Sequence, residues 1–156
     1  MPTTARILAL LGWIGICFLV AAMASQFMLG EWYAGLRKPV WTPPNWLFGP
    51  VWTLLYLMMG IAAWLVWRQG GFSGARLALG LFLFQLVLNG LWSWLFFGLQ
   101  RPGLASIEIS VLWVTILASL IAFWRIIPLD GIFLIPYAVW VGFAAFLNIT
   151  LFRMNR

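Results

Sequence analysis

The chain has 156 residues, of which 65% are hydrophobic and 8% are charged, and its mean hydropathy is +1.03. A soluble domain is about 45–50% apolar and about 25% charged, so this composition indicates an integral membrane protein. The net charge is +6, but the nine lysines and arginines stand singly or in pairs between apolar segments, which is typical of lipid headgroup contact and not of a nucleic-acid surface. The absence of histidine and the presence of one cysteine and three acidic residues exclude a Ser-His triad, histidine-ligated haem, metallohydrolase chemistry and an intrachain disulfide.

Five apolar segments of about 22 residues each are long enough, at about 1.5 Å per residue, to cross a hydrocarbon core of about 30 Å. We therefore expect an all-α membrane protein with residues 1–156 forming one domain, a bundle of five transmembrane helices. The predicted helices are residues 7–30, 46–67, 77–99, 103–124 and 131–152.

The first segment has a second interpretation. Arg6, the apolar stretch after it and the sequence Ala22-Met23-Ala24 resemble a secretory signal with a cleavage site, so removal of residues 1–24 stays an alternative. The apolar character continues through Phe27 to Leu29, which favours a retained first helix.

Residues 31–45 are predicted to form a loop, because proline removes a donor and pushes the preceding residue out of the helical region. A loop this rich in aromatic residues is too apolar for a solvated linker, and we interpret it as a lid. Asn45 is the expected N-cap of the next helix. The residues that give the lid this character are Trp32, Tyr33, Arg37, Lys38, Pro39, Trp41, Pro43 and Pro44.

Three of the predicted helices carry a face that is both polar and aromatic, which we expect to face other helices or a cavity instead of lipid. A separate pair of small residues, Ala138 and Gly142, predicts close contact between helices. Tryptophans nearer the helix ends are predicted to lie at the membrane interface or against lipid: Trp13, Trp64, Trp67, Trp113 and Trp124. The polar and aromatic faces consist of Trp52 and Tyr56; of Gln85, Asn89, Trp92 and Ser93; and of Tyr137, Trp140, Ala144 and Asn148.

Glu108 lies inside the fourth segment, where a charged carboxylate at the bilayer centre costs about 2.5–3.5 kcal/mol on insertion scales. Three states remain open for it: a protonated acid, a hydrogen bond to Asn89 or Gln85, or a position close enough to the interface to reach water. Orientation is undecided, since four basic residues fall on one side and five on the other.

Four blocks of sequence carry a resemblance to a known family. They read W-Y-x-x-L-x-K-P-x-W-x-P-P from Trp32 to Pro44, V-W-T-x-L-Y from Val51 to Tyr56, Q-x-x-x-N-x-x-W-S from Gln85 to Ser93, and P-Y-x-x-W-x-x-F-x-x-x-L-N from Pro136 to Asn148. In these blocks the chain resembles the translocator protein family, which comprises bacterial tryptophan-rich sensory proteins (TspO) and the mitochondrial peripheral-type benzodiazepine receptor. The resemblance runs in order along nearly the whole chain.

The resemblance implies a five-helix bundle, usually a homodimer in bacteria, in which the first loop closes a pocket between helices. It implies as ligands tetrapyrroles such as protoporphyrin IX, sterols or other isoprenoids, and synthetic benzodiazepine-type compounds, with transport, sensing or stress regulation as the role and a bacterial cell envelope as the expected location. Light-dependent breakdown of porphyrin is ascribed to some members, whose two associated tryptophans match Trp52 and Trp140. Glu108 falls where other members often carry an acid. The animal sterol pattern is incomplete, because no basic residue follows Tyr137 within five positions.

Three functions are therefore compared. The first is a receptor or carrier in which aromatic rings stack on a porphyrin, the lid cations meet its carboxylates, and neither a metal nor another cofactor is required. The second is a small proton-coupled transporter that uses Glu108. The third is an enzyme limited to photo-oxidation at Trp52 and Trp140. The expected ligand-binding residues are Trp32, Tyr33, Arg37, Lys38, Trp41, Pro43, Pro44, Trp52, Tyr56, Gln85, Asn89, Trp92, Phe96, Glu108, Tyr137, Trp140, Ala144 and Asn148, and the expected partners are a tetrapyrrole, an isoprenoid or sterol lipid, membrane lipids and a second copy of the chain.

Overall fold

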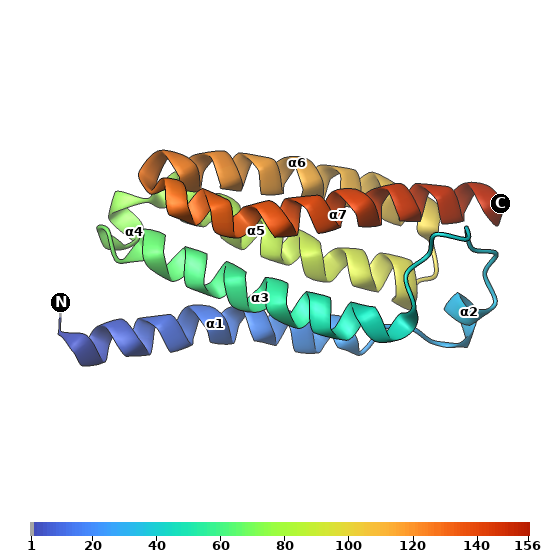
Figure 1. Cartoon of the computed structure of the whole chain (residues 1–156), viewed down its shortest axis with the longest axis horizontal. Coiled ribbons are helices and arrows are strands. Elements are labelled where there is room, and N and C mark those ends of the chain that lie inside the picture. Colours follow the sequence, from blue (N-terminus) through green and yellow to red (C-terminus); the bar gives the residue numbers. More distant parts are fainter. Residues whose placement is uncertain (1) are drawn as a thin grey trace.

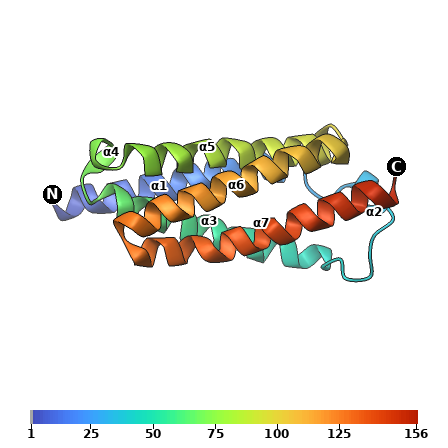
Figure 2. The ribbon, with the colours of Figure 1, turned by 90° about the horizontal axis from the view of Figure 1, so that it is seen from above.

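The computed structural model describes residues 2–156, which form five long helices and short helical turns between them (Figure 1). The long helices lie along one axis, and consecutive ones run in opposite directions (Figures 1 and 2). The long elements are α1 (Thr3–Ser25), α3 (Asn45–Trp67), α5 (Arg76–Ser93) with its π-helical continuation η1 (Trp94–Gly98), α6 (Pro102–Ile126) and α7 (Pro128–Met154), and the short ones are α2 (Glu31–Ala34) and α4 (Gly71–Gly74).

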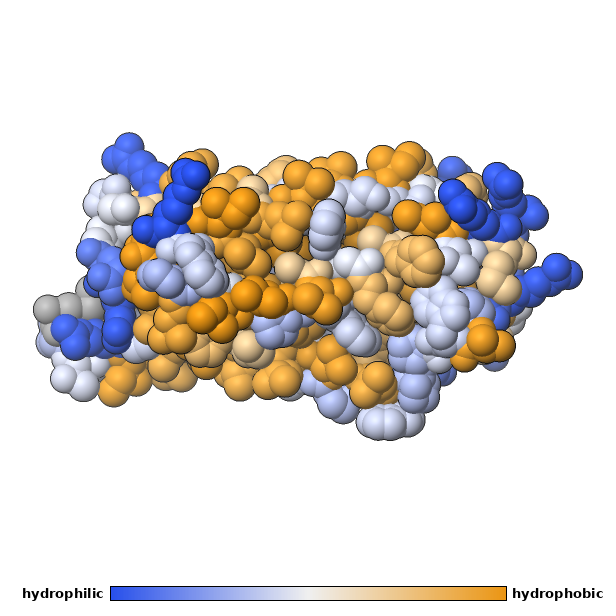
Figure 3. All heavy atoms as spheres, turned by 45° about the horizontal axis from the view of Figure 1, so that its top comes forward, coloured by the Kyte–Doolittle hydropathy of each residue, from blue (hydrophilic) through white to orange (hydrophobic). Residues whose placement is uncertain are grey.

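Each of the five long segments is long and apolar enough to cross a membrane, which confirms the predicted fold class. Hydrophobic side chains cover the middle of the visible surface, and hydrophilic ones gather at its two ends (Figure 3). The protein is therefore a multi-pass integral membrane protein.

The ends of the first helix differ from the prediction of residues 7–30. Helix α1 begins at Thr3 and ends at Ser25, and the chain then turns through Leu29, whose φ of 48° lies in the left-handed region. A non-glycine residue rarely adopts this conformation, which costs of order 1–3 kcal/mol. Hydropathy alone did not reveal this turn, because the turning residues are themselves apolar.

The lid also begins differently from the all-loop prediction. Its first residues form the single turn α2, which ends at Ala34, before the prolines that prevent further helix. Asn45 is the first residue of α3 and not its N-cap: Pro44 occupies that position, and no side chain caps the helix. At the other end of the bundle, Ile127 alone separates α6 from α7, because Pro128 fits the first turn of a helix.

The helices form a ring in which α1 contacts α3, α3 contacts α7, α7 contacts α6, α6 contacts α5 and α5 contacts α1. Two close approaches fix this ring. A Cβ added at Gly60 of α3 would lie 2.8 Å from the Cα of Ile14 in α1. Trp113 of α6 donates its indole N–H to the carbonyl oxygen of Ala138 at 3.0 Å and lies against Gly142, which confirms the close contact predicted from these two small residues.

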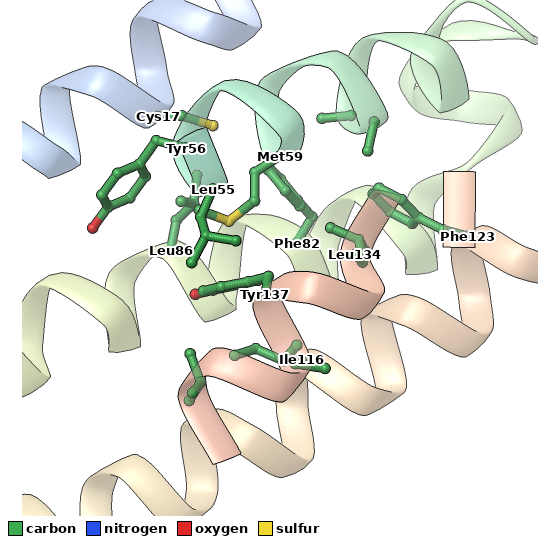
Figure 4. Packing of buried hydrophobic residues seen from close by; sticks show 14 of the residues in the cluster. Cys17, Leu55, Tyr56, Met59, Phe82, Leu86, Ile116, Phe123, Leu134 and Tyr137 are labelled. Carbon is green, nitrogen blue, oxygen red and sulfur yellow. The ribbon is translucent and has the colours of Figure 1, made fainter. Parts of the chain in front are cut away.

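The centre of the bundle is densely packed by side chains from all five long helices (Figure 4). Cys17, Met59, Phe82 and Tyr137 belong to α1, α3, α5 and α7 respectively, and none is more than 1% exposed. Trp13 also belongs to this core, where it packs against Phe82, so its predicted position against lipid or the interface is wrong.

Candidate ligand site beneath the lid

A small cavity of about 30 Å³ lies at the lid end of the bundle, between α3, α7 and the end of α5. We call it the aromatic cavity, because seven of its twelve lining residues are aromatic. Its lining consists of Met28, Tyr33, Phe48, Trp52, Trp92, Phe96, Phe97, Trp140, Ala144, Leu147, Asn148 and Leu151. The structure thus brings together seven of the predicted ligand-binding residues, namely Tyr33, Trp52, Trp92, Phe96, Trp140, Ala144 and Asn148.

The π-helical turn η1 supplies one wall of this cavity. In an α-helix, neighbouring residues point about 100° apart, and the wider π turn reduces that angle. Phe96 and Phe97 consequently both line the cavity, with ring centroids 4.8 Å apart. Trp92, one turn earlier, stacks on Phe96 at 5.5 Å and an interplanar angle of 26°.

The opposite wall combines α3 and α7. Phe48 and Trp52 are one turn apart on α3, and the Phe48 ring meets Trp140 of α7 edge-on at a centroid distance of 5.9 Å. The sequence interpretation that Trp52 and Trp140 face inward toward a shared space is consistent with this geometry. Rings from three transmembrane segments therefore surround the cavity.

Two buried hydrogen-bond donors at this cavity have no partner within residues 2–156. They are the hydroxyl group of Tyr33 and the indole N–H of Trp140. Burial raises the pKa of the Tyr33 hydroxyl, so this group stays a donor at neutral pH. Because an unpaired buried donor costs about 1–3 kcal/mol, a ligand with an acceptor in this position would remove a penalty that the free protein carries.

Asn148, by contrast, already uses its side chain within the protein. Its Oδ1 accepts the indole N–H of Trp92 at 2.9 Å, and its Nδ2 donates to the carbonyl oxygen of Pro102 at 2.8 Å. The residue therefore joins α5, α6 and α7 and orients Trp92 toward the cavity.

Four predicted site residues form a hydrogen-bond network next to the aromatic cavity without lining it. Tyr56 donates to Asn89 Oδ1, Asn89 Nδ2 donates to the hydroxyl of Tyr137 at 2.8 Å, and Tyr137 donates to Gln85 Oε1 at 2.6 Å. The Trp52 ring lies 5.6 Å from the Tyr56 ring and 6.3 Å from the Tyr137 ring. The network thus ties α3, α5 and α7 together and supports Trp52 from one side.

The lid is attached to α7 at two places. The side chain of Asn155, just after α7, accepts the Arg37 N–H at 2.8 Å and donates to the Arg37 carbonyl oxygen at 2.9 Å. Trp41 stacks on Phe146 at 5.4 Å and meets Phe143 edge-on at 5.7 Å.

The lid cations lie outside the aromatic cavity. The Lys38 ammonium donates to the carbonyl oxygens of Ala34 and Leu36 and sits 4.7 Å from the centre of the Tyr33 ring. It is therefore held directly over the residue whose hydroxyl is unpaired. The side chain of Arg37 is exposed.

Glu108 is buried in the second turn of α6, and neither of its carboxyl oxygens has a hydrogen-bond partner in the described chain. The hydrogen bond to Asn89 or Gln85 considered from the sequence is absent: the Asn89 amide pairs with Tyr56 and Tyr137, and the Gln85 amide pairs with Tyr137 and with Met59 Sδ. A buried, unpaired carboxyl group is more stable as the neutral acid.

The remaining predicted residues lie around the cavity, and their role in ligand binding stays a prediction. Trp32 lines a neighbouring hollow at the base of the lid, and Tyr56 lines a groove between α1 and α3. Pro43 and Pro44 complete the lid before α3. The residues in this group are Trp32, Arg37, Lys38, Trp41, Pro43, Pro44, Tyr56, Gln85, Asn89, Glu108 and Tyr137.

Five lining residues were not predicted. Phe48 lies four positions before Trp52, and Leu147 and Leu151 follow Ala144 at helical spacing, so periodicity contained the signal for these three. Met28 and Phe97 had no such signal, because the left-handed turn at Leu29 and the π turn determine their positions.

The fold and the site together define a helical membrane protein in which a proline-rich lid covers an aromatic cavity between transmembrane segments. The sequence profile of the TspO/MBR family matches residues 7–154, and the chain belongs to this family. It is 40% identical to the tryptophan-rich protein TspO of Chlorobaculum tepidum, over 96% of this chain and 98% of that protein. It is 41% identical to the human translocator protein, over 85% of this chain and 82% of that protein, and 34% identical to the tryptophan-rich sensory protein of Cereibacter sphaeroides, over 93% and 90%. This membership supports a role as a membrane receptor or sensor.

Proposed function

We propose that this protein is a membrane receptor or carrier that binds a porphyrin-like tetrapyrrole in the aromatic cavity. The observation that carries the proposal is the combination of aromatic walls with two unpaired buried donors, Tyr33 Oη and Trp140 Nε1. A flat conjugated ring with peripheral acceptors matches both features. Each stacked aromatic pair adds about 0.5–1.5 kcal/mol beyond burial, and a hydrogen bond to an unpaired donor adds about 0.5–1.5 kcal/mol.

The charge distribution supports the same ligand class. Arg37 and Lys38 belong to the lid, and Lys38 already lies over the Tyr33 ring. Carboxylate arms of a porphyrin would meet these cations where the lid contacts water.

Binding requires the cavity to open, because about 30 Å³ holds one water molecule, whereas small-molecule pockets measure about 300–1,000 Å³. Met28 provides a route, since its side chain also lines two larger hollows beside the cavity. One is a groove of about 330 Å³ between α1 and α3, and the other is a hollow of about 490 Å³ at the base of the lid. Displacement of this unbranched, flexible side chain would join the three spaces.

The direct test is a titration of the protein in lipid nanodiscs with protoporphyrin IX, in which binding is monitored through the absorption spectrum of the porphyrin. Trp140→Phe removes the indole N–H and reduces the stacking area, and it is expected to weaken binding by roughly tenfold. Trp46→Phe is the control, because Trp46 is 72% exposed and does not line the cavity. Equal affinities for the native protein and Trp140→Phe would overturn the proposed site.

A second candidate function rests on Glu108, whose buried carboxyl group has no partner in the described chain. A membrane acid of this kind is suited to couple proton movement to transport. In proteoliposomes, a proton-coupled transporter would release protons when a porphyrin substrate is added, and Glu108→Gln would abolish the signal. Absence of proton release from the native protein would eliminate this candidate.

A further inference from the structure

The groove between α1 and α3 shares walls with the aromatic cavity and does not involve the lid. Met28, Phe48 and Trp52 line both spaces, so these three side chains form the partition between them. The groove has a volume of about 330 Å³, compared with about 30 Å³ for the cavity.

Small residues keep this groove open toward the membrane. Ala22 on α1, and Gly49 and Thr53 on α3, line it and are exposed on the outside of the bundle. All three lie in helices that are long and apolar enough to cross a membrane, toward the lid ends of those helices, so an apolar occupant that extends outward from the groove would enter the lipid around α1 and α3. Nothing lies within 4 Å of a Cβ added at Gly49, so a larger side chain would fit at this position.

The groove is lined mainly by apolar side chains, and its hydroxyl-bearing residues are Ser25, Thr53, Tyr56 and Ser93. The hydroxyl of Thr53 donates to the carbonyl oxygen of Gly49 at 2.8 Å. The hydroxyl of Ser25 donates to the carbonyl oxygen of Ala22 at 2.7 Å. These hydroxyl donors are therefore already used within their own helices. The two unpaired donors described above belong instead to residues that line the aromatic cavity, where acceptor atoms of the ring would bind.

We propose that the site accepts tetrapyrroles that carry a long apolar ester tail, with the ring in the aromatic cavity and the tail leaving through the α1–α3 groove into the bilayer. This inference rests on the proposed function, because it takes the ring position from it. A tail in the groove gains little over a tail in lipid, since both surroundings are apolar. The groove therefore acts as an exit that permits a tailed ligand to bind, and not as a source of affinity.

The matched probes are methyl pheophorbide a and pheophytin a, which share one tetrapyrrole ring and differ in having a methyl or a phytyl ester. Each is used to displace protoporphyrin IX from the protein in nanodiscs. We expect both esters to displace the porphyrin from the native protein with midpoints within about threefold of each other. Gly49→Leu and, independently, Ala22→Leu fill the groove and are expected to raise the midpoint of the phytyl ester by roughly tenfold while leaving that of the methyl ester unchanged.

Gly80→Leu is the control for an added side chain. Gly80 lies on α5, has nothing within 4 Å of an added Cβ and does not line the groove, so both midpoints should stay at the native values. The inference is overturned if the native protein binds the methyl ester but rejects the phytyl ester, if neither ester displaces bound porphyrin, or if filling the groove affects the two esters equally. If protoporphyrin IX itself does not bind the native protein, the proposed function fails instead.

Discussion

Two tyrosines show how a single hydroxyl group takes a structural or a binding role according to its neighbours. The Tyr137 hydroxyl donates to Gln85 and accepts from Asn89, so its hydrogen-bonding capacity is used within the bundle. The Tyr33 hydroxyl is also buried but has no partner in the described residues. Loss of the Tyr137 hydroxyl removes a hydrogen-bond partner from Asn89 Nδ2 and from Gln85 Oε1, whereas loss of the Tyr33 hydroxyl breaks no hydrogen bond in the described residues.

The corresponding variants separate these roles. Tyr137→Phe is expected to lower the free energy of unfolding by about 1–2 kcal/mol, measured as a lower thermal unfolding midpoint in detergent micelles. Tyr33→Phe removes an unpaired buried donor, so it is expected to raise that midpoint and to weaken porphyrin binding several-fold. A comparable loss of stability in Tyr33→Phe would show that its hydroxyl is bonded in the folded protein.

At the scale of elements, the lid is held by its contacts with α7 and by its own prolines. Asn155 pairs with both backbone polar groups of Arg37, and Trp41 rests on the rings of Phe143 and Phe146. The lid also adjoins the left-handed turn at Leu29, where the chain leaves α1. These contacts hold the lid against α7.

Asn155→Ala is expected to loosen this attachment. It removes both hydrogen bonds to the Arg37 backbone, worth about 0.5–1.5 kcal/mol each, together with the bond from Asn155 Nδ2 to the Leu151 carbonyl oxygen. Amide hydrogen exchange in residues 35–44, the Arg37 amide above all, should therefore accelerate roughly tenfold. Asn45→Ala is a matched control, since Asn45 is exposed and makes no side-chain cap at α3. Unchanged exchange in Asn155→Ala would mean that the aromatic contacts of Trp41 alone hold the lid.

The sequence revealed the elements of this fold more completely than their relative rotation. Hydropathy identified all five spans, and helical spacing placed Trp52 and Tyr56 on one face, where the rings do meet. Periodicity cannot show which helix a face meets. The polar stripe of Gln85 and Asn89 was therefore predicted without its partner Tyr137, and Phe97 was missed because a π turn shifts the helical register by one residue.

At the scale of the whole molecule, the bundle has two different ends. The α4 end is closed by short connections, whereas the opposite end carries the lid (Figure 1). The aromatic cavity and the two hollows that adjoin it also lie toward the lid end. Basic side chains lie at both ends, four against five, so charge alone does not orient the chain in a membrane. The asymmetry that matters for function is therefore structural, with the candidate site at one membrane face.

The account depends most on where a porphyrin ring binds, and a structure of the full chain with protoporphyrin IX in lipid measures this directly. We expect the ring to lie beneath the lid between Trp52, Trp92 and Trp140, with an acceptor atom within hydrogen-bonding distance of Tyr33 Oη or Trp140 Nε1 and with Met28 displaced. A ring bound on the outer, lipid-facing surface of the helices, with the aromatic cavity still closed, would contradict the account.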